Sequence, residues 1–382
     1  MKKMLPLFKI YWDDEDVQNI TKAIREGMHW AIGPNIEKLE GMLAEYIGSK
    51  HCVLFNSGTS ALHASLLAHG IGNGDEVIVP SFTFIATANA PLFAGARPVF
   101  SDIEEKTFGL DPEDVKEKIT SKTKAIIPMH YGGCPCMIRE LREIADDKNL
   151  ILIEDAAESL GARVSERKVG SFGDSAIFSF CANKIITTGE GGCIVTDKTD
   201  IYQKLKLIRS HGRLENSNYF SSSSYMDYIT LGYNFRMSNI TAALGISQLR
   251  KINDIITMRR RNAEYMTYRL SKISGMSLPI IPADYFNVYQ MYTVVIDGGS
   301  QRRDKLLKHL SNKGIMTKVY FHPVHMTRFY KKMGYKCKLP ITEMVSGKVL
   351  TLPTYPELTK PEMDYIVQEI KNFMPGDDRN GE

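Results

Sequence analysis

Residues 150–196 read LILIEDAAESLGARVSERKVGSFGDSAIFSFCANKIITTGEGGCIVT, and this stretch decides the fold. It contains three short apolar runs, Ile151–Ile153, Ile177–Phe180 and Cys193–Thr196, with polar and glycine-rich segments between them. Strands buried on both faces of a parallel sheet are apolar throughout, as the first of these runs is. Acidic residues directly follow the first run, and a lysine follows the second. The stretch therefore predicts neighbouring buried strands with ionisable side chains at their ends.

The same pattern of short apolar runs extends upstream to about residue 50. Helices are predicted at Thr59–His69 and Phe84–Phe93. They lie between further predicted strands at Cys52–Phe55, Glu76–Val79, Pro98–Phe100 and Ala125–Pro128. Strands that alternate with helices indicate an α/β domain with a mostly parallel central sheet.

The alternation of strands and helices ends at about Lys251, where a long helix is predicted to residue 273. Short strands around Met291–Ile296 and Met316–Tyr320 follow, with helices around Arg302–Ser311 and Lys360–Asn372. These elements predict a smaller α+β domain. Because 382 residues exceed one compact core, we expect two domains.

The expected boundaries are residues 15–250 for the large α/β domain and 251–375 for the small one. Residues 1–14 should pack with the small domain, and residues 376–382 should form a flexible tail. A polar segment at 214–228, which includes Ser221–Ser224, is long enough to be a lid or to cross to another subunit.

Charge and hydropathy exclude several classes of protein. The 48 Lys and Arg residues against 44 Asp and Glu give a formal net charge of +4, and the two signs are interspersed. Nucleic-acid binders usually concentrate basic residues on one face, whereas a small excess suits a local anion site such as one for phosphate. No run approaches the roughly 18 apolar residues of a membrane span, so we expect a cytoplasmic protein.

The six cysteines are widely spaced and lack a CxxC pair, which is typical of reduced thiols. His130 lies close to Cys134 and Cys136, and these three residues could suggest a metal site. A fourth ligand at a usual zinc spacing is missing. We therefore expect a turn here and no metal.

Asn56-Ser57-Gly58-Thr59-Ser60 stands between a predicted strand and a predicted helix. Gly58 allows the backbone to approach a ligand, and the start of the helix offers free N–H groups and the positive end of its dipole. The segment therefore has the outline of a phosphate site. Taken alone, the segment favours the alternative, an ordinary helix cap made by Ser57 or Thr59.

Acidic residues occupy the carboxyl end of the predicted strand at 151–153, where open α/β sheets bind their ligands. A buried carboxylate at Asp155 needs a cationic partner, or it takes up a proton. A protonated pyridine nitrogen is one such partner. The alternative is that Asp155 caps a following helix.

Lys184 follows an apolar strand and precedes the glycine-rich segment Gly189-Glu190-Gly191-Gly192. A lysine in this position can be desolvated, which favours the neutral, nucleophilic amine that Schiff-base chemistry requires. The alternative is an ordinary surface lysine. Pyridoxal phosphate (PLP) needs a phosphate cradle, a carboxylate for its ring nitrogen and a lysine for its aldehyde. All three occur here in that order, each at the end of a predicted strand.

At this point the chain resembles a known family, the DegT/DnrJ/EryC1/StrS sugar aminotransferases. The resemblance runs from about residue 8 to 372. It is carried by NSGTSAL (56–62), GDEVIVPSFTFIAT (74–87), EDAAES (154–159), GDSAIFSFCANKIITTGEGG (173–192) and GYNFRMSNITAALGISQL (232–249). It implies the PLP-dependent transferase type I (aspartate aminotransferase) fold.

Carried over residue by residue, the resemblance implies that Lys184 bonds the cofactor aldehyde and shuttles the proton. Asp155 would keep the pyridine nitrogen protonated. The phosphate would be bound by Gly58, Thr59 and Ser179. Asn234 would reach the phosphate of a neighbouring subunit, which implies a homodimer with shared active sites.

Two further positions depart from the family pattern. Phe84 falls where members stack an aromatic ring on PLP, and many of them have Trp or Tyr there. Glu158 falls where many members have Gln or His near the phenolic oxygen of PLP. A carboxylate is less compatible with a phenolate, so Glu158 is expected to be protonated or hydrogen-bonded elsewhere.

Residues 183–192 resemble the GDP-perosamine synthase-like members, which aminate carbon 4 of nucleotide-linked 4-keto-6-deoxy sugars. The expected activity is therefore transfer of an amino group from glutamate to such a sugar, with amination at carbon 3 as an alternative. Substrate contacts are expected from His322 or His325. Arg236 could bind a diphosphate or the donor carboxylate, or form a structural salt bridge.

Three other functions are alternatives to an aminotransferase. A PLP dehydratase of the same fold would have a histidine at the lysine position, and Lys184 argues against it. A non-catalytic regulatory or binding protein would not need both Asp155 and Lys184. A nicotinamide-dependent oxidoreductase is a third class, but Gly70-Ile-Gly72-Asn-Gly74 follows a helix and precedes a strand, the reverse of a dinucleotide fingerprint.

Overall fold

The computed structural model describes residues 4–214, 223 and 225–374. A central seven-stranded sheet has the order β1-β9-β8-β5-β4-β2-β3. The five strands from β8 to β3 run parallel, whereas β9 pairs antiparallel with both β8 and β1. The predicted α/β class with a mostly parallel sheet is therefore confirmed. The strands are β1 His51–Phe55, β2 Glu76–Pro80, β3 Arg97–Ser101, β4 Thr123–Ile126, β5 Ile151–Asp155, β8 Ser175–Ser179 and β9 Gly192–Thr196.

The apolar strands are buried because helices cover both faces of the sheet. Alternate residues of one strand enter different cores, as Val53 and Phe55 of β1 do on one face and Leu54 on the other. The helices of the large α/β part are α2 Pro34–Ile47, α3 Gly58–Ala68, α4 Ile85–Phe93, α5 Pro112–Lys118, α6 Ile138–Asp147 and α7 Thr199–Arg209. The turn at Gly70–Gly74 joins the end of α3 to β2, as the sequence predicts.

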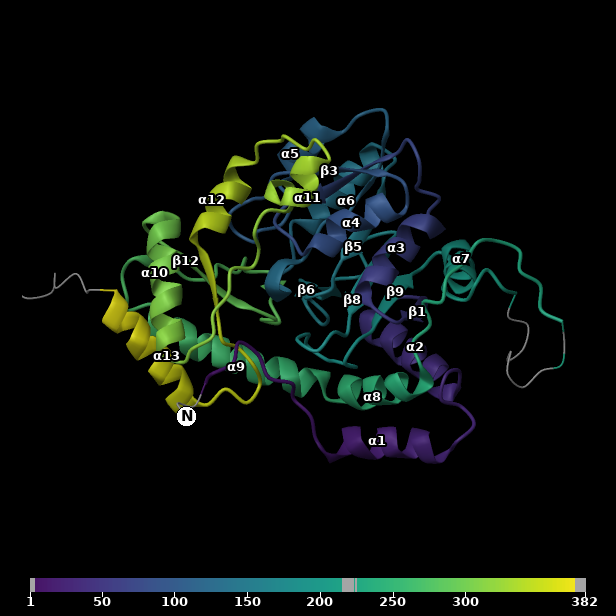
Figure 1. The fold of residues 1–382 in the computed structure, drawn as a ribbon, viewed down its shortest axis with the longest axis horizontal. Coiled ribbons are helices and arrows are strands. Elements are labelled where there is room, and N and C mark those ends of the chain that lie inside the picture. The colour runs from purple at the N-terminus through teal and green to yellow at the C-terminus, as the bar shows by residue number, and fades with distance from the viewer. Residues whose placement is uncertain (1–3, 215–222, 224, 375–382) are drawn as a thin grey trace, which may run out of the picture.

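Two helices in succession form the base of the molecule, α8 Asn239–Arg250 and α9 Ile252–Leu270. They run one after the other from beneath the sheet to the second, smaller part of the chain (Figure 1). Helix α1, Asp14–Arg25, lies beside α8. Buried Lys251 fixes this arrangement, because its Nζ contacts the carboxylates of both Asp13 and Asp16.

The smaller part contains the antiparallel sheet β10-β12-β13, Met276–Ser277, Tyr292–Ile296 and Val349–Leu352. Its helices are α10 Gly299–Asn312, α11 Arg328–Lys332, α12 Pro340–Lys348 and α13 Lys360–Phe373. Leu5 lies in the core of this part, and its backbone pairs with Ile315. The boundary at residue 250 stays a prediction, since α8 and α9 are separated by Lys251 alone.

The strand predicted at Met316–Tyr320 is wrong. Only Lys318 pairs with a neighbouring chain segment, at Thr351, and the rest of this segment forms no ladder. A third sheet, β11-β6-β7, comprises Tyr285–Phe286, Arg163–Val164 and Arg167–Lys168. Short 3₁₀ turns occur at Tyr131–Gly133 and Val324–Met326.

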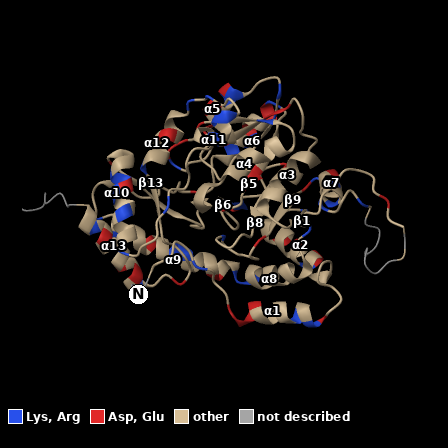
Figure 2. Cartoon of the chain, viewed as in Figure 1, with Lys and Arg blue, Asp and Glu red and all other residues tan. Residues whose placement is uncertain are grey.

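Two of the expectations on charge and hydropathy can be compared with the structure, whereas those on the polar loop and the tail cannot. Lys, Arg, Asp and Glu are interspersed over the helices (Figure 2). No helix among residues 4–214 and 225–374 is long and apolar enough to cross a membrane. Most of the predicted polar loop at 214–228, including Ser221, Ser222 and Ser224, and the predicted tail at 376–382 lie outside the described residues.

Candidate active site

Asp155 ends β5 at the centre of the sheet, and its side chain is buried. The hydroxyl of Thr87 donates a hydrogen bond to Oδ2 at 2.7 Å, and the backbone N–H of Ala157 donates to Oδ1 at 3.2 Å. Burial raises the pKa of this carboxyl above its ordinary value, while these two donors oppose the shift. No helix follows, so the alternative prediction that Asp155 is a helix N-cap is wrong.

Asp155 is suited to a cationic ligand atom. Among the described residues, no lysine, arginine or histidine forms an ion pair with it. A buried carboxylate without such a partner is costly, and a protonated ring nitrogen supplies the missing charge. The carboxyl therefore fits the requirement of a PLP site.

Lys184 lies beyond the end of β8 in a short turn. Its Nζ is 3.3 Å from Oε1 of Glu158, and only 14% of its side chain is exposed. The other oxygen of Glu158 accepts a hydrogen bond from the backbone N–H of Gly132 at 3.0 Å. Burial raises the pKa of Glu158, and the charge of Lys184 acts in the opposite direction. Lys184 acts on Asp155 in the same sense, so the amine and both carboxyls share one site.

A small cradle lies between the ends of β1 and β8. A Cβ atom added to Gly58 would lie 3.0 Å from Cβ of Ser179, so glycine allows the start of α3 to approach the end of β8 closely. Ser57 caps α3, because its Oγ accepts from the N–H of Ser60 at 3.1 Å. Thr59 is exposed in the first turn of α3. The cap by Ser57 is therefore present, and a phosphate cradle at the same helix N-terminus stays a prediction.

The two other predicted cofactor residues lie at the edges of this site. Phe84 directly precedes α4, the helix that carries Thr87, and 58% of its surface is exposed. Asn234 is exposed, and its carbonyl accepts from Nδ2 of Asn56 at 3.4 Å. Asn234 therefore lies beside the glycine cradle of its own chain, and its expected reach to another subunit stays a prediction.

The predicted substrate residues have different environments. His322 is exposed. His325 is buried, with Nδ1 2.7 Å from Oγ of Ser81 and Nε2 3.4 Å from Oε1 of Glu343. Since both ring nitrogens of His325 contact protein groups, the prediction of a histidine in contact with substrate rests on His322. Arg236 is half-buried and donates to Oγ of Ser210 at 3.1 Å, which leaves both of its expected roles open.

His130 has a structural environment. Its Nδ1 accepts from the N–H of Cys136 at 3.1 Å, and its Nε2 lies 3.0 Å from Glu154. Within the described residues, no group of three His, Cys, Asp or Glu side chains could hold a metal ion.

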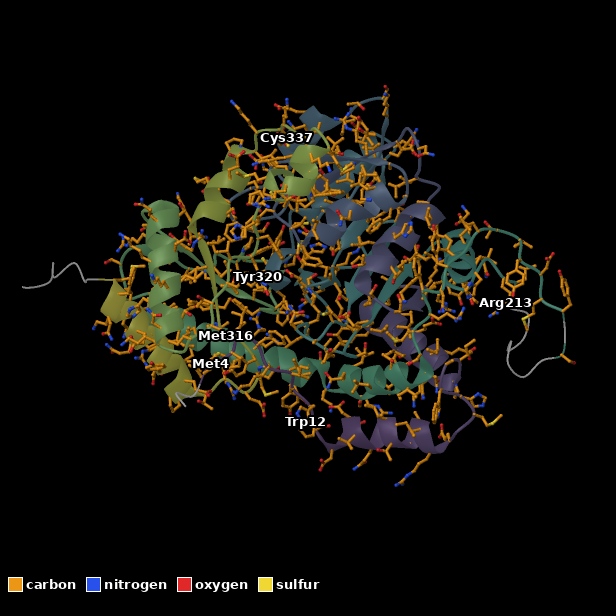
Figure 3. The ribbon with its side chains drawn as sticks, in the orientation of Figure 1. Met4, Trp12, Arg213, Met316, Tyr320 and Cys337 are labelled. Carbon is orange, nitrogen blue, oxygen red and sulfur yellow. The ribbon has the colours of Figure 1, made fainter. Side chains whose placement is uncertain are left out.

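Sequence reasoning missed several residues that complete the site. Thr87 and Gly132 bind the two carboxyls, and buried Gln290 donates from Nε2 to the carbonyl of Asn183, beside Lys184. Tyr320 lies in the middle of the molecule, and Glu158 contributes to a raised pKa of its hydroxyl, of which burial is the main cause (Figure 3). The adjacent His322 could have drawn attention to Tyr320, whereas a backbone donor such as Gly132 leaves no side-chain signal.

The chain is similar to known proteins over almost its whole length. The model of the DegT/DnrJ/EryC1/StrS aminotransferase family matches residues 11–371. The GDP-perosamine synthase of Caulobacter vibrioides is 40% identical over 346 residues, which cover 90% of this chain and 91% of that protein. The structure of DesV from S. venezuelae in complex with a ketimine intermediate has a TM-score of 0.89 at 31% identity, covering 98% of this chain and 100% of DesV. The PLP-form of a putative sugar aminotransferase from Streptococcus pneumoniae has a TM-score of 0.91 at 26% identity, with 97% and 99% of the chains covered.

The fold and the site define a PLP-dependent transaminase. The buried carboxyl, the lysine and the glycine cradle meet at one edge of a type I transferase sheet. The chain belongs to the DegT/DnrJ/EryC1/StrS aminotransferase family and is a sugar aminotransferase.

Proposed function

We propose that the enzyme transfers an amino group from glutamate to carbon 4 of a nucleotide-linked 4-keto-6-deoxyhexose. The observation that carries the substrate is the 40% identity to a GDP-perosamine synthase, which extends over nine-tenths of both chains. Two further relatives with the same name are 35% and 34% identical over 97% of this chain. Their shared name favours GDP as the nucleotide.

When bound, PLP withdraws electrons from the carbon that bears the amino group. In our proposal Lys184 holds the cofactor aldehyde in the resting enzyme. With the donor in place, the freed amine of Lys184 would act as the group that carries a proton between the donor and the cofactor. The contact between Nζ of Lys184 and Oε1 of Glu158 would hold the amine in one position. The reverse transfer onto the ketosugar uses the same group.

Asp155 would keep the ring nitrogen protonated. Its two hydrogen bonds, from Thr87 and Ala157, hold the carboxylate in one orientation. The cradle of Gly58, Thr59 and Ser179 would bind the phosphate, and Phe84 would cover one face of the ring. These four residues lie at strand ends and helix starts, which makes their positions rigid.

Glu158 departs from the Gln or His of many relatives, and its environment supports a role at the amine rather than at the phenolic oxygen. One oxygen faces Nζ of Lys184 while the other accepts from Gly132. Because burial raises the pKa of Glu158, its carboxyl can take up a proton that the lysine releases.

The active unit would be a homodimer, and the enzyme would work in the cytoplasm. Support for a second subunit comes from exposed apolar side chains at two places. Met28 and Trp30 precede α2, and Tyr228, Ile229 and Leu231 lie between α7 and α8 in the sequence. Sedimentation should give twice the chain mass of 43.1 kDa. A monomer with full activity would contradict the shared site.

Substrate and position can be tested together. The PLP-loaded enzyme is incubated with glutamate and GDP-, UDP- or dTDP-linked 4-keto-6-deoxy sugars, and with the matching 3-keto sugars. We expect 2-oxoglutarate and an amino sugar only with a 4-keto substrate, and most rapidly with GDP. Nuclear magnetic resonance of the product locates the new amine. Amination at carbon 3, or a preference for another nucleotide, would contradict the respective part of the proposal.

A further inference from the structure

Glu154 precedes Asp155 on β5, but its side chain points to the opposite face of the sheet, as alternate strand residues do. This side chain is completely buried and makes four contacts with hydrogen-bond donors. Oε1 accepts from the backbone N–H groups of Phe172 and Gly173 at 2.7 and 2.6 Å. Oε2 accepts from Gly170 at 2.7 Å and faces Nε2 of His130 at 3.0 Å.

The protonation state of His130 follows from its hydrogen bonds. The backbone N–H of Cys136 can only donate, so Nδ1 of His130, which lies 3.1 Å away, must be the acceptor. Nε2 therefore carries the hydrogen and donates it to Glu154. All four groups around Glu154 are donors, and a carboxylate with two bare oxygens is the form that satisfies them.

These contacts connect the elements on both sides of Asp155. His130 follows β4, and its backbone N–H also donates to the carbonyl of Asp155 at 3.1 Å. Residues 170–173 lead into β8, whose far end carries Ser179 and then Lys184. Strand β5 lies between β4 and β8 in the sheet. The buried carboxylate of Glu154 on β5 thus binds both the segment that follows β4 and the segment that leads into β8.

We propose that Glu154 is a positioning residue that fixes Asp155 against the cofactor. It does not face the cofactor itself, and it acts through the backbone of β5 and of the two neighbouring strands. This inference rests on the proposed role of Asp155. Without the carboxylate, the end of β5 would lose its anchor on one face, and Asp155 would no longer be held at a fixed distance from the ring nitrogen.

The test uses Glu154→Gln, which keeps the volume but replaces one acceptor by an NH₂ group that must face two donors. We expect the PLP dissociation constant, measured by absorbance titration of the cofactor-free protein, to rise about tenfold, or ~1.4 kcal/mol. The pH at which the absorbance of bound PLP titrates should also shift, because this band reports the protonation of the cofactor. A residue that only supports the fold would leave this midpoint unchanged.

The matched control is Glu369→Gln in α13, a nearly buried carboxylate that also pairs with a histidine, His309, but in the smaller core. Its PLP affinity and absorbance midpoint should equal those of the wild type. If Glu154→Gln behaves like this control while Asp155→Ala weakens PLP binding, the inference on Glu154 is wrong and the role of Asp155 stands. If Asp155→Ala binds PLP with wild-type affinity and absorbance midpoint, the proposed role of Asp155 is wrong, and the inference on Glu154 falls with it.

A second variant serves if Glu154→Gln does not fold. His130→Ala leaves the three backbone donors on Glu154 and removes the side-chain link from Glu154 to the chain after β4, together with the acceptor for the N–H of Cys136. We expect a smaller increase in the PLP dissociation constant, about threefold, with a shift of the absorbance midpoint in the same direction. Wild-type values for both quantities in a folded His130→Ala protein would overturn the inference.

Discussion

Nζ of Lys184 lies 3.3 Å from a carboxylate oxygen of Glu158, and both side chains are removed from bulk water. The charge of the same amine opposes the rise that burial causes in the pKa of Asp155, so one lysine acts on two buried carboxyls that come from a single stretch of chain. Such an arrangement is costly without a ligand, since three ionisable groups share little solvent. Because burying these three groups together costs free energy, we infer that they serve catalysis and not stability.

Replacing Lys184 by alanine should abolish turnover while sparing the fold. The variant retains Asp155 and the glycine cradle, so it should still bind PLP, but without a covalent bond. We expect kcat to fall by about 10³-fold or more, the scale of a lost general acid–base and covalent group. Steady-state kinetics and gel filtration followed by absorbance measure both effects. Wild-type turnover would show that another residue is the base.

Glu158→Gln should separate catalysis from cofactor binding. Glutamine can still accept from the N–H of Gly132, but it can no longer take up a proton from Lys184. We predict a kcat about 10–100-fold lower, with the PLP dissociation constant changed by less than about threefold. Kinetics and PLP titration on the same preparation test this. An unchanged kcat would mean that the carboxyl serves only to hold the lysine in place.

The hydroxyl of Thr87 donates to Asp155 at 2.7 Å, so Thr87→Val should weaken the hold on this carboxylate. A hydrogen bond to a charged group contributes about 1.5–3 kcal/mol, which corresponds to a PLP dissociation constant at least about tenfold higher. Thr257→Val is the control, because the hydroxyl of exposed Thr257 donates to the carbonyl of Asn253 within α9, away from Asp155. Equal PLP affinities for the two variants would argue against a role of Thr87.

The pH dependence of stability provides an independent test of Asp155. Burial raises its pKa above 3.8, so the folded, cofactor-free protein binds more protons than the unfolded chain in the window above that value. Stability then decreases as the pH rises through this window. Asp155→Asn removes the effect.

The cofactor-free Asp155→Asn variant should therefore melt at a higher temperature than the wild type near pH 8, and the difference should become smaller as the pH falls and the wild-type carboxyl takes up a proton. Saturating PLP should reverse the order near pH 8, since only the wild type offers the ring nitrogen a carboxylate. Differential scanning fluorimetry measures the melting temperature of both proteins under each condition. A variant that melts below the wild type without PLP near pH 8 would contradict the assigned pKa direction.

Much of the large α/β part was predictable because its strands are short, apolar and bounded by glycine or polar residues. Asp155 and Lys184 could be found for the same reason, as each follows such a run. Strand β13 was not predictable, since Val349–Leu352 continues from α12 without a turn residue. Met316–Tyr320 has the composition of a strand, but it has a single paired residue.

The contacts that complete the site depend on the tertiary structure and could not be read from the sequence. Thr87 lies 68 residues from Asp155 and looks like any hydroxyl on a helix. Gly132 acts through its backbone N–H. His325 resembles a ligand-binding histidine in sequence, yet Ser81 occupies one of its ring nitrogens from a distance of 244 residues along the chain.

The central claim is that Lys184 and Asp155 hold opposite ends of one PLP molecule, and borohydride reduction of the loaded enzyme followed by peptide mass spectrometry tests it most directly. We predict a yellow protein in which reduction fixes the cofactor on the peptide that contains Lys184. In Asp155→Asn the same peptide should carry the cofactor at lower occupancy. In Lys184→Ala no peptide should carry it. Reduced cofactor on a different lysine in an enzyme that retains full turnover would contradict the account.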